Sequence, residues 1–162
     1  MRVGKIRSEQ EKLVLTAIFS ALGVVLSPVF FPVGPTKCYP FQHALNGLAG
    51  VLIGPIYAGL AALITGIIRN MLGTGTIFAF PGGIPGALVV GLIYIITRRD
   101  EAALCEPIGT FIGALLSAFI VGPITGKTMA PELFIIAFLM SSIPGSILGY
   151  IVLKIVRRAF KN

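Results

Sequence analysis

Two short segments hold most of the polar side chains that could bind a ligand, and each adjoins long apolar runs. The first reads KCYPFQHALN (37–46), in which Gln42 and His43 lie four and three residues before Asn46. On a helix, residues at these spacings share one face. The candidate binding residues of this segment combine a cation, two aromatic rings, two amides and an imidazole: Lys37, Tyr39, Phe41, Gln42, His43 and Asn46.

These side chains also have a simpler explanation. Amides and imidazoles inside an apolar bundle can serve only to hydrogen-bond neighbouring helices. For one such residue, that packing role explains the sequence as well as ligand binding does. Three polar side chains beside two aromatic rings favour a pocket.

The second segment, RNMLGTGTIFAFPGG (69–83), begins at the end of an apolar run. A lone arginine in that position often only reaches the lipid headgroups. Here the following glycines allow the chain to bend, the threonines offer hydroxyls, and the phenylalanines can stack on a flat ring. The candidate binding residues of this segment are Arg69, Asn70, Thr74, Thr76, Phe78 and Phe80.

The residue types of both segments restrict the ligand. Neither segment contains a carboxylate, and Glu132 is the nearest one expected on the same side of the membrane. Cations, amides and aromatic rings suit a small, flat, neutral or anionic heterocycle, whereas a bare cation would find no counter-charge. The glycines form no dinucleotide or phosphate-loop motif, because no strand precedes them and the Gly-Lys-Ser/Thr ending is absent.

The sequence gives little reason to expect an enzyme, a cofactor or a metal. His43 is the single histidine, no carboxylate pair has helical spacing within an apolar run, and neither HExxH nor GxSxG occurs. Cys38 could approach His43 across a loop, but nothing nearby suggests an orienting acid. Cys38 and Cys105 form no CxxC pair, so no disulfide is implied either.

The elements that position these segments must cross a membrane. The chain has 162 residues, of which 56% are hydrophobic and 12% charged, too few polar residues to cover a soluble domain. A signal peptide explains the first apolar run poorly, because similar runs recur to the C-terminus. We expect an all-α integral membrane protein, a compact bundle of six transmembrane helices in one domain (1–162), with spans at about 12–31, 43–54, 56–72, 83–97, 107–124 and 131–156.

The basic residues predict the orientation of this bundle. Lys and Arg accumulate on the cytoplasmic side of membrane proteins. Of the 13 basic residues, all but Lys37, Arg69 and Lys127 fall on one side of the six-span arrangement. Both termini are therefore expected in the cytoplasm. The net charge of +7 is explained by this topology and by anionic lipid, without a nucleic-acid partner.

A pair of alanines marks a possible docking surface on the first span. Ala17 and Ala21 form a small-xxx-small pattern, which lets another helix pack at close range. The same spacing recurs among the glycines of this chain, so the pattern alone is a weak signal.

Together these features resemble the substrate-binding S components of energy-coupling factor (ECF) vitamin transporters. KCYPFQHALN (37–46) and IIRNMLGTGTIFAFPGGIPGALVVG (67–91) are similar to the ThiW family, which is associated with uptake of the thiazole precursor of thiamin. The resemblance implies that the chain captures hydroxyethylthiazole or its phosphate outside the cell. It also implies that Ala17 and Ala21 dock on a membrane coupling subunit tied to two ATPase subunits, in keeping with the lack of a Walker motif here.

Two alternatives stay open at this point. The ligand could be another thiamin-related compound, either the pyrimidine precursor or thiamin itself. The chain could instead be a structural or assembly subunit of a membrane complex, with its polar cluster serving only for packing.

Overall fold

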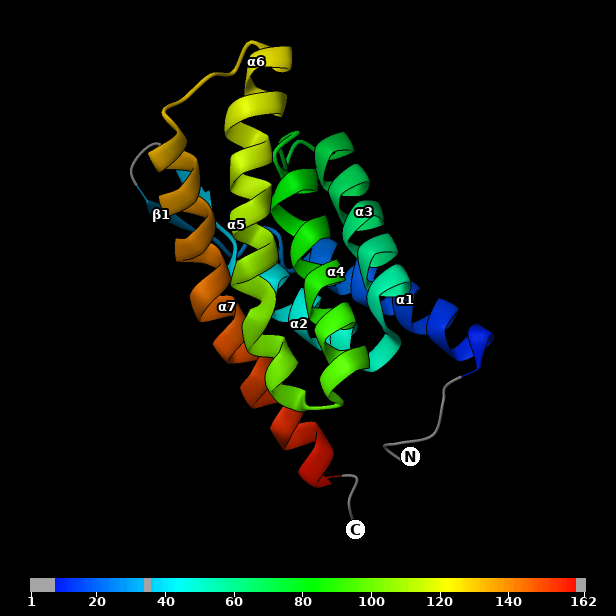
Figure 1. Ribbon diagram of the computed structural model, residues 1–162. Coiled ribbons are helices and arrows are strands. Elements are labelled where there is room, and N and C mark those ends of the chain that lie inside the picture. Colours follow the sequence, from blue (N-terminus) through cyan, green and yellow to red (C-terminus); the bar gives the residue numbers. More distant parts are fainter. Residues whose placement is uncertain (1–7, 34–35, 160–162) are drawn as a thin grey trace.

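The computed structural model describes residues 8–33 and 36–159, and it is 82% helical. The main helices are α1 (Glu9–Val25), α2 (Pro40–Ile53), α3 (Pro55–Met71), α4 (Ala79–Thr97), α5 (Glu106–Leu116) and α7 (Pro131–Ala159) (Figure 1). Shorter elements join them: the antiparallel strands β1 (Phe31–Val33) and β2 (Thr36–Cys38), the 3-10 helix η1 (Asp100–Cys105), the π-helical turn η2 (Ser117–Val121) and α6 (Gly122–Thr125).

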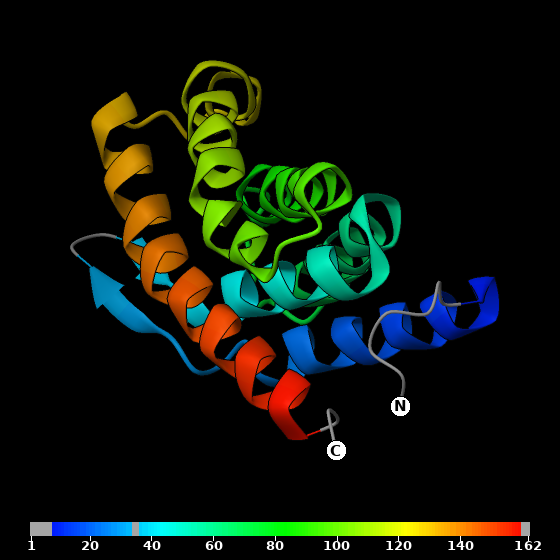
Figure 2. The same cartoon turned by 60° about the horizontal axis from the view of Figure 1, so that its bottom comes forward.

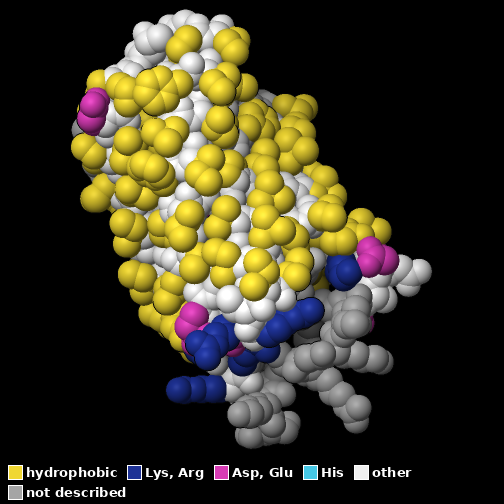
Figure 3. Space-filling view, in the orientation of Figure 1, with side chains coloured by type: hydrophobic (Ala, Val, Ile, Leu, Met, Phe, Trp, Pro, Cys, Tyr) yellow, Lys and Arg dark blue, Asp and Glu magenta, His cyan; other side chains and the backbone are white. Residues whose placement is uncertain are grey.

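The helices have the length and surface of a membrane protein. Three helical stretches among the described residues are long and apolar enough to cross a bilayer: Ala79–Thr97, Asp100–Thr125 and Pro131–Ala159. Large apolar side chains also cover the outside of the bundle, including Ile56, Ile96 and Ile124, each more than three-quarters exposed (Figure 3). Such a surface is stable in lipid rather than water. The chain is therefore an α-helical membrane protein.

The first apolar run folds differently from its prediction. We expected a span over 12–31, but α1 ends at Val25 and the chain then turns into β1. Proline disfavours the helical conformation of the residue before it, which here is Ser27, preceding Pro28. Pro32 and the β-branched and aromatic residues around it then favour an extended chain. The expected loop 32–42 accordingly contains the hairpin and the first turn of α2.

Two of the other helices begin earlier than predicted, but all of them end close to their expected positions. α2 starts at Pro40 instead of residue 43, and α4 starts at Ala79 instead of residue 83. Pro40 occupies the first turn of its helix, where the missing N–H costs nothing. The predicted spans 56–72, 107–124 and 131–156 correspond to α3, to the continuous helical stretch α5–η2–α6, and to α7.

Helix α2 occupies the centre of the bundle. It packs against α1, α3, α4 and α7 (Figure 2), and ten of its 14 residues are buried. Close contact with α7 depends on Gly145, since a Cβ there would lie 2.4 Å from the Pro40 carbonyl oxygen. This glycine lets α7 approach the beginning of α2, where the residues predicted to bind a ligand are found.

The two ends of the bundle differ in charge. Lys and Arg side chains gather where η1 and the last turns of α7 lie (Figure 3), and there Arg157 pairs with Asp100 at 2.6 Å. Hydrogen bonds from its own backbone amide, from the Tyr150 hydroxyl and from the Lys154 ammonium lower the pKa of the Glu101 carboxyl to about 2. The connections α3–α4 and α6–α7 lie at the opposite end (Figure 1).

Candidate functional site

A cavity of about 480 Å³ lies toward the end of the bundle opposite the basic cluster. Its wall is built from β2, the start of α2, the end of α3, the α3–α4 connection, the start of α4, residues 127–129 and the first half of α7. The volume falls in the range of about 300–1,000 Å³ that is usual for small-molecule sites. Of the twelve residues predicted to bind a ligand, eight line this cavity: Lys37, Tyr39, Gln42, His43, Arg69, Thr74, Thr76 and Phe78.

Arg69 is the most deeply buried cation in the cavity wall. Its side chain is only 2% exposed, and its guanidinium lies 4.2 Å from the centre of the Tyr39 ring. One terminal nitrogen donates to the Gln42 side-chain oxygen, and the other donates to the Thr74 carbonyl at 3.3 Å. The cation–π contact and the hydrogen bonds together hold the guanidinium over the ring.

The loop after α3 is shaped by hydrogen bonds to the end of that helix. The Arg69 carbonyl accepts from the backbone amides of Thr74 and Gly75 at 2.9 and 3.0 Å, and Gly73 adopts a positive φ of 70°. The Asn70 side chain donates to the Gly66 and Thr76 carbonyls. Asn70 therefore shapes the loop and does not line the cavity.

The β-hairpin is attached to α7. The Tyr39 amide donates to the Ser141 hydroxyl at 3.1 Å, and the Cys38 thiol donates to the Ala137 carbonyl at 3.5 Å. These contacts hold the β2 strand, and with it Lys37, beside the cavity. Cys38 is fully buried and directed at α7, so the conceivable couple between Cys38 and His43 does not form.

One side of the cavity is aromatic and was not predicted from the sequence. Phe134 and Phe138 of α7 line it with Phe78, and the Phe134 ring centre lies 4.9 Å from that of Phe78 and 6.1 Å from that of Phe138. A flat apolar ring can stack within such a cluster. The four-residue spacing of Phe134 and Phe138 was the available signal, because it puts both rings on one face of a helix. Lys127 and Met129 line the same cavity and were also not predicted.

A buried carboxylate lies next to the cavity, at the start of α5. Glu106 is 0% exposed, and its Oε1 lies 2.8 Å from His43 Nδ1 and 2.9 Å from the Thr110 hydroxyl. The Asn46 amide also donates to Oε1, and the Ser142 hydroxyl donates to Oε2. The hydrogen bond with His43 joins the carboxyl group directly to a ring nitrogen of the imidazole. Glu106 thereby fixes the ring orientation of a residue that lines the cavity.

The expectation that Glu132 is the nearest carboxylate is therefore wrong. Glu132 lies exposed in the first turn of α7, whereas Glu106 is in contact with His43. The predicted spans 83–97 and 107–124 leave Glu106 in the connection between them, together with four other charged residues, Arg98, Arg99, Asp100 and Glu101. Gly86 of α4 makes room for it, since a Cβ there would lie 2.2 Å from Oε1.

A comparison with models of protein families identifies the family to which the chain belongs. Residues 13–159 match the model of the thiamine-precursor transporter protein, ThiW. The chain belongs to the ThiW family. No curated protein sequence and no solved structure gave a match. Membership of ThiW makes this chain a component of thiamine-precursor transport, a role of transporters rather than of enzymes.

Four of the predicted binding residues lie outside the cavity wall of this ThiW member: Phe41, Asn46, Asn70 and Phe80. Asn46 bonds Glu106 and the Gly83 carbonyl. The Phe80 ring covers Gly66, where a Cβ would meet it at 2.9 Å, so Phe80 joins α4 to α3. Phe41 is half-buried on the first turn of α2.

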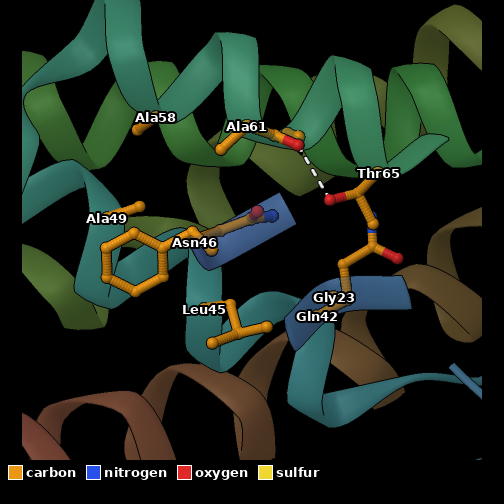
Figure 4. A pocket seen from close by; sticks show the side chains of 10 residues that line it. Gly23, Gln42, Leu45, Asn46, Ala49, Ala58, Ala61 and Thr65 are labelled. Atoms are coloured by element: carbon orange, nitrogen blue, oxygen red, sulfur yellow. Dashed lines mark hydrogen bonds between the residues drawn. The ribbon is translucent and has the colours of Figure 1, made fainter. Parts of the chain in front are cut away.

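A second, much smaller void lies between α1, α2 and α3 (Figure 4). It measures about 10 Å³ and is lined by Gln42, Asn46 and Thr65 among mostly apolar residues. About 10–15 Å³ is the least that holds one water molecule, so no vitamin precursor enters it. The Thr65 hydroxyl donates to the Ala61 carbonyl at 2.8 Å, and Thr65 lines this void and not the larger cavity.

The two alanines of the predicted docking surface lie on the outside of this ThiW member. Ala17 and Ala21 are exposed on α1, next to the exposed apolar side chains of Leu13, Val14 and Ile18. The opposite face of α1, with Thr16, Phe19 and Ser20, packs against the bundle.

Proposed function

We propose that this chain is the substrate-capture (S) component of an ECF importer and that it binds a thiamin-precursor thiazole in the 480 Å³ cavity. The cavity is the observation that carries the proposal. It combines a cluster of aromatic rings with hydrogen-bonding groups, and this combination suits a small heterocycle with a polar substituent. Membership of the ThiW family supports thiamin-precursor chemistry.

The ring and its substituent would contact different groups. Phe78, Phe134 and Phe138 would cover the faces of the thiazole ring. Gln42, His43 and Thr74 are within the same wall and would meet the ring nitrogen and the hydroxyl group. Glu106 would act on the ligand only through His43, as a positioning residue.

We further propose that the bundle, as a single domain over 1–162, crosses the cell membrane six times with both termini inside. Clustering of basic residues at one end, and the position of the cavity at the other, support this orientation. α1 and α2, at 17 and 14 residues, would cross as short or tilted helices. The cavity would then face the outside of the cell.

Single cysteines test this topology. Cys38 is too deeply buried to report on its side of the membrane, so Thr125→Cys and Arg99→Cys are better probes in a chain without other cysteines, because both positions are exposed. An impermeant thiol reagent added to intact cells should label the cysteine at position 125 and not the one at position 99. The reverse pattern would overturn the orientation.

Calorimetry on the purified chain tests which compound is the ligand. Hydroxyethylthiazole or its phosphate should bind without ATP, and more tightly than thiamin or the pyrimidine precursor. If a folded chain bound none of these compounds, the transport role in this form would be refuted and the role of a structural or assembly subunit would be favoured. Tightest binding of thiamin or the pyrimidine precursor would change the assigned substrate.

Docking on a coupling subunit and two ATPase subunits is tested by replacing Ala17 and Ala21 with Leu. Larger side chains on an exposed helix face should keep a partner helix away and abolish uptake in cells that contain the partner subunits. Because the face points away from the cavity, the affinity of the isolated chain should stay within about threefold, or about 0.7 kcal/mol. An equal loss of affinity and uptake would assign this face to the fold instead.

A further inference from the structure

A buried cation in the cavity wall lacks a counter-charge. Arg69 is 2% exposed, yet none of the carboxylates in the described part of the chain lies within 4.0 Å of its guanidinium. Its partners are the neutral oxygens of Gln42 and Thr74. Its Nε atom is buried and has no hydrogen-bond partner among the described residues.

Such an arrangement is costly without a ligand. Burying an ionised group is unfavourable unless it is paired and its hydrogen bonds are satisfied. A guanidinium has five N–H donors, and the protein bonds found here use two of its nitrogens. Ionisable side chains inside membrane-spanning bundles usually mark functional sites, where they pair with another charged group.

Two further cations line the same cavity. Lys37 lies 4.4 Å from the Phe30 ring centre, and that ring lies 5.7 Å from the ring of Tyr39, on which Arg69 stacks. Lys37 and Arg69 are thus held along one line of aromatic contacts. Lys127 approaches from the α6–α7 connection. No Asp or Glu is among the described lining residues, and Glu106, the carboxylate nearest to them, already accepts from four side chains.

The glycine turn at residues 73–75 does not supply anion-binding amides. Backbone amides of Gly73, Thr74 and Gly75 already donate to the carbonyls of Asn70 and Arg69. Arg69, Lys37 and Lys127 are the charged groups of the described wall that can recognise an anion.

We infer that the cavity takes its thiazole as the phosphate monoester, with the phosphate bound by Arg69, Lys37 and Lys127. This inference rests on the proposed function. A phosphate monoester carries a charge of about −2 near neutral pH and offers several acceptor oxygens. Arginine matches phosphate geometry particularly well, and charge-assisted hydrogen bonds are roughly twice as strong as neutral ones. A neutral alcohol would leave all three cations without a counter-charge.

Calorimetry with two ligands tests the inference on the full chain. Hydroxyethylthiazole phosphate should bind at least about tenfold more tightly than hydroxyethylthiazole, because only the ester makes the charge-assisted contacts. Lys37→Gln and Lys127→Gln should each weaken binding of the ester by about threefold or more and leave binding of the alcohol unchanged. Both lysines are exposed, so these variants do not depend on a buried position.

Arg69→Gln should have a larger effect on the preference for the ester than either lysine variant. Arg98→Gln is its control. Arg69→Gln should remove most of the preference for the ester. Arg98 is an exposed cation after α4, so Arg98→Gln makes the same charge change away from the cavity and should leave the preference intact. If Arg69→Gln fails to fold, the lysine variants still test whether the cavity binds the phosphate group.

The outcomes separate this inference from the proposed function. Binding of the alcohol as tightly as the ester, or an equal effect of the lysine variants on both, would overturn the phosphate inference and leave thiazole capture standing. Binding of neither compound to the folded wild-type chain would refute both proposals. A preference for the ester that disappears in the lysine variants supports the inference.

Discussion

The cations at the two ends of this bundle differ in what balances them. At the basic end, Arg157 pairs with Asp100 at 2.6 Å, and Lys154 pairs with Glu101 at 3.2 Å. In the cavity at the other end, Arg69 is more deeply buried and has no carboxylate within reach among the described residues. Burial makes an unbalanced charge more costly, so the deeper cation should be the better paired one. Arg69 nevertheless lacks a carboxylate partner among the described residues, which supports the proposal that its partner is a ligand.

The polar groups next to the cavity show the same contrast. Glu106 is fully buried, but it accepts hydrogen bonds from His43, Asn46, Thr110 and Ser142. This network lies within the protein and connects α2, α5 and α7. The guanidinium of Arg69, by contrast, retains an Nε–H donor that has no acceptor among the described residues. The network should therefore govern stability, and the cations of the cavity should govern ligand affinity.

Loss of the Glu106 carboxylate should have the largest effect. Glu106→Gln replaces one acceptor oxygen with a donor that faces groups which themselves donate. We expect the free energy of unfolding to fall by about 3 kcal/mol, measured by thermal or denaturant unfolding in detergent. Glu132→Gln is the matched control, since Glu132 is exposed and its change should stay within about 0.5 kcal/mol. Equal effects of both variants would mean that the network contributes no special stability.

Breaking a paired cation at the basic end should affect stability and not ligand binding. Asp100→Asn removes the carboxylate that pairs with Arg157, in a position where the Asp100 side chain is only 12% exposed. We expect a loss of about 1–2 kcal/mol in unfolding free energy, because a hydrogen bond to a charged group is removed at a partly exposed site. Thiazole affinity, measured by calorimetry, should not change. A loss of affinity would contradict the division between the two ends.

The aromatic side of the cavity should have a moderate effect, confined to affinity. Phe78→Leu keeps an apolar side chain but removes a ring that lines the cavity, so ligand binding should weaken by about 0.5–1.5 kcal/mol, or about 2- to 13-fold. Phe80→Leu makes the same change two residues away, where the ring covers Gly66 instead. Its affinity should stay within about twofold of wild type. Equal losses would show that the cavity wall includes Phe80.

The exposed ion pair at the basic end should have the smallest effect, and it should depend on pH. The pKa of Glu101 is lowered from 4.5 to about 2, so its contribution to stability is present above about pH 4.5 and is lost as the pH falls toward 2. At pH 6, Glu101→Gln should lower the melting temperature by a few degrees at most. The difference from wild type should shrink between pH 4.5 and 2. A difference that is constant with pH would exclude ionisation of Glu101 as its cause.

The sequence alone determined the class of the protein and the parts of the chain that form the cavity. Hydrophobic runs predicted the helical segments, because an apolar stretch must satisfy its backbone internally in lipid. The segments 37–46 and 69–83 contribute eight of the predicted residues to the cavity wall, since polar and aromatic side chains are conspicuous between such runs. Their motifs also sufficed for the family, which the match over 13–159 shows.

Only the tertiary structure decided which side chains of those segments face the cavity and what lies behind them. Asn46 was expected in the binding site, yet it turns to Glu106, a residue 60 positions away in the chain. Glu106 itself looked like part of a charged loop, because its burial depends on α2, α4, α5 and α7 meeting around it. Local spacing gives the face of one helix. The neighbours of that face come from distant parts of the chain, and they determine whether a polar side chain completes a network or remains available to a ligand.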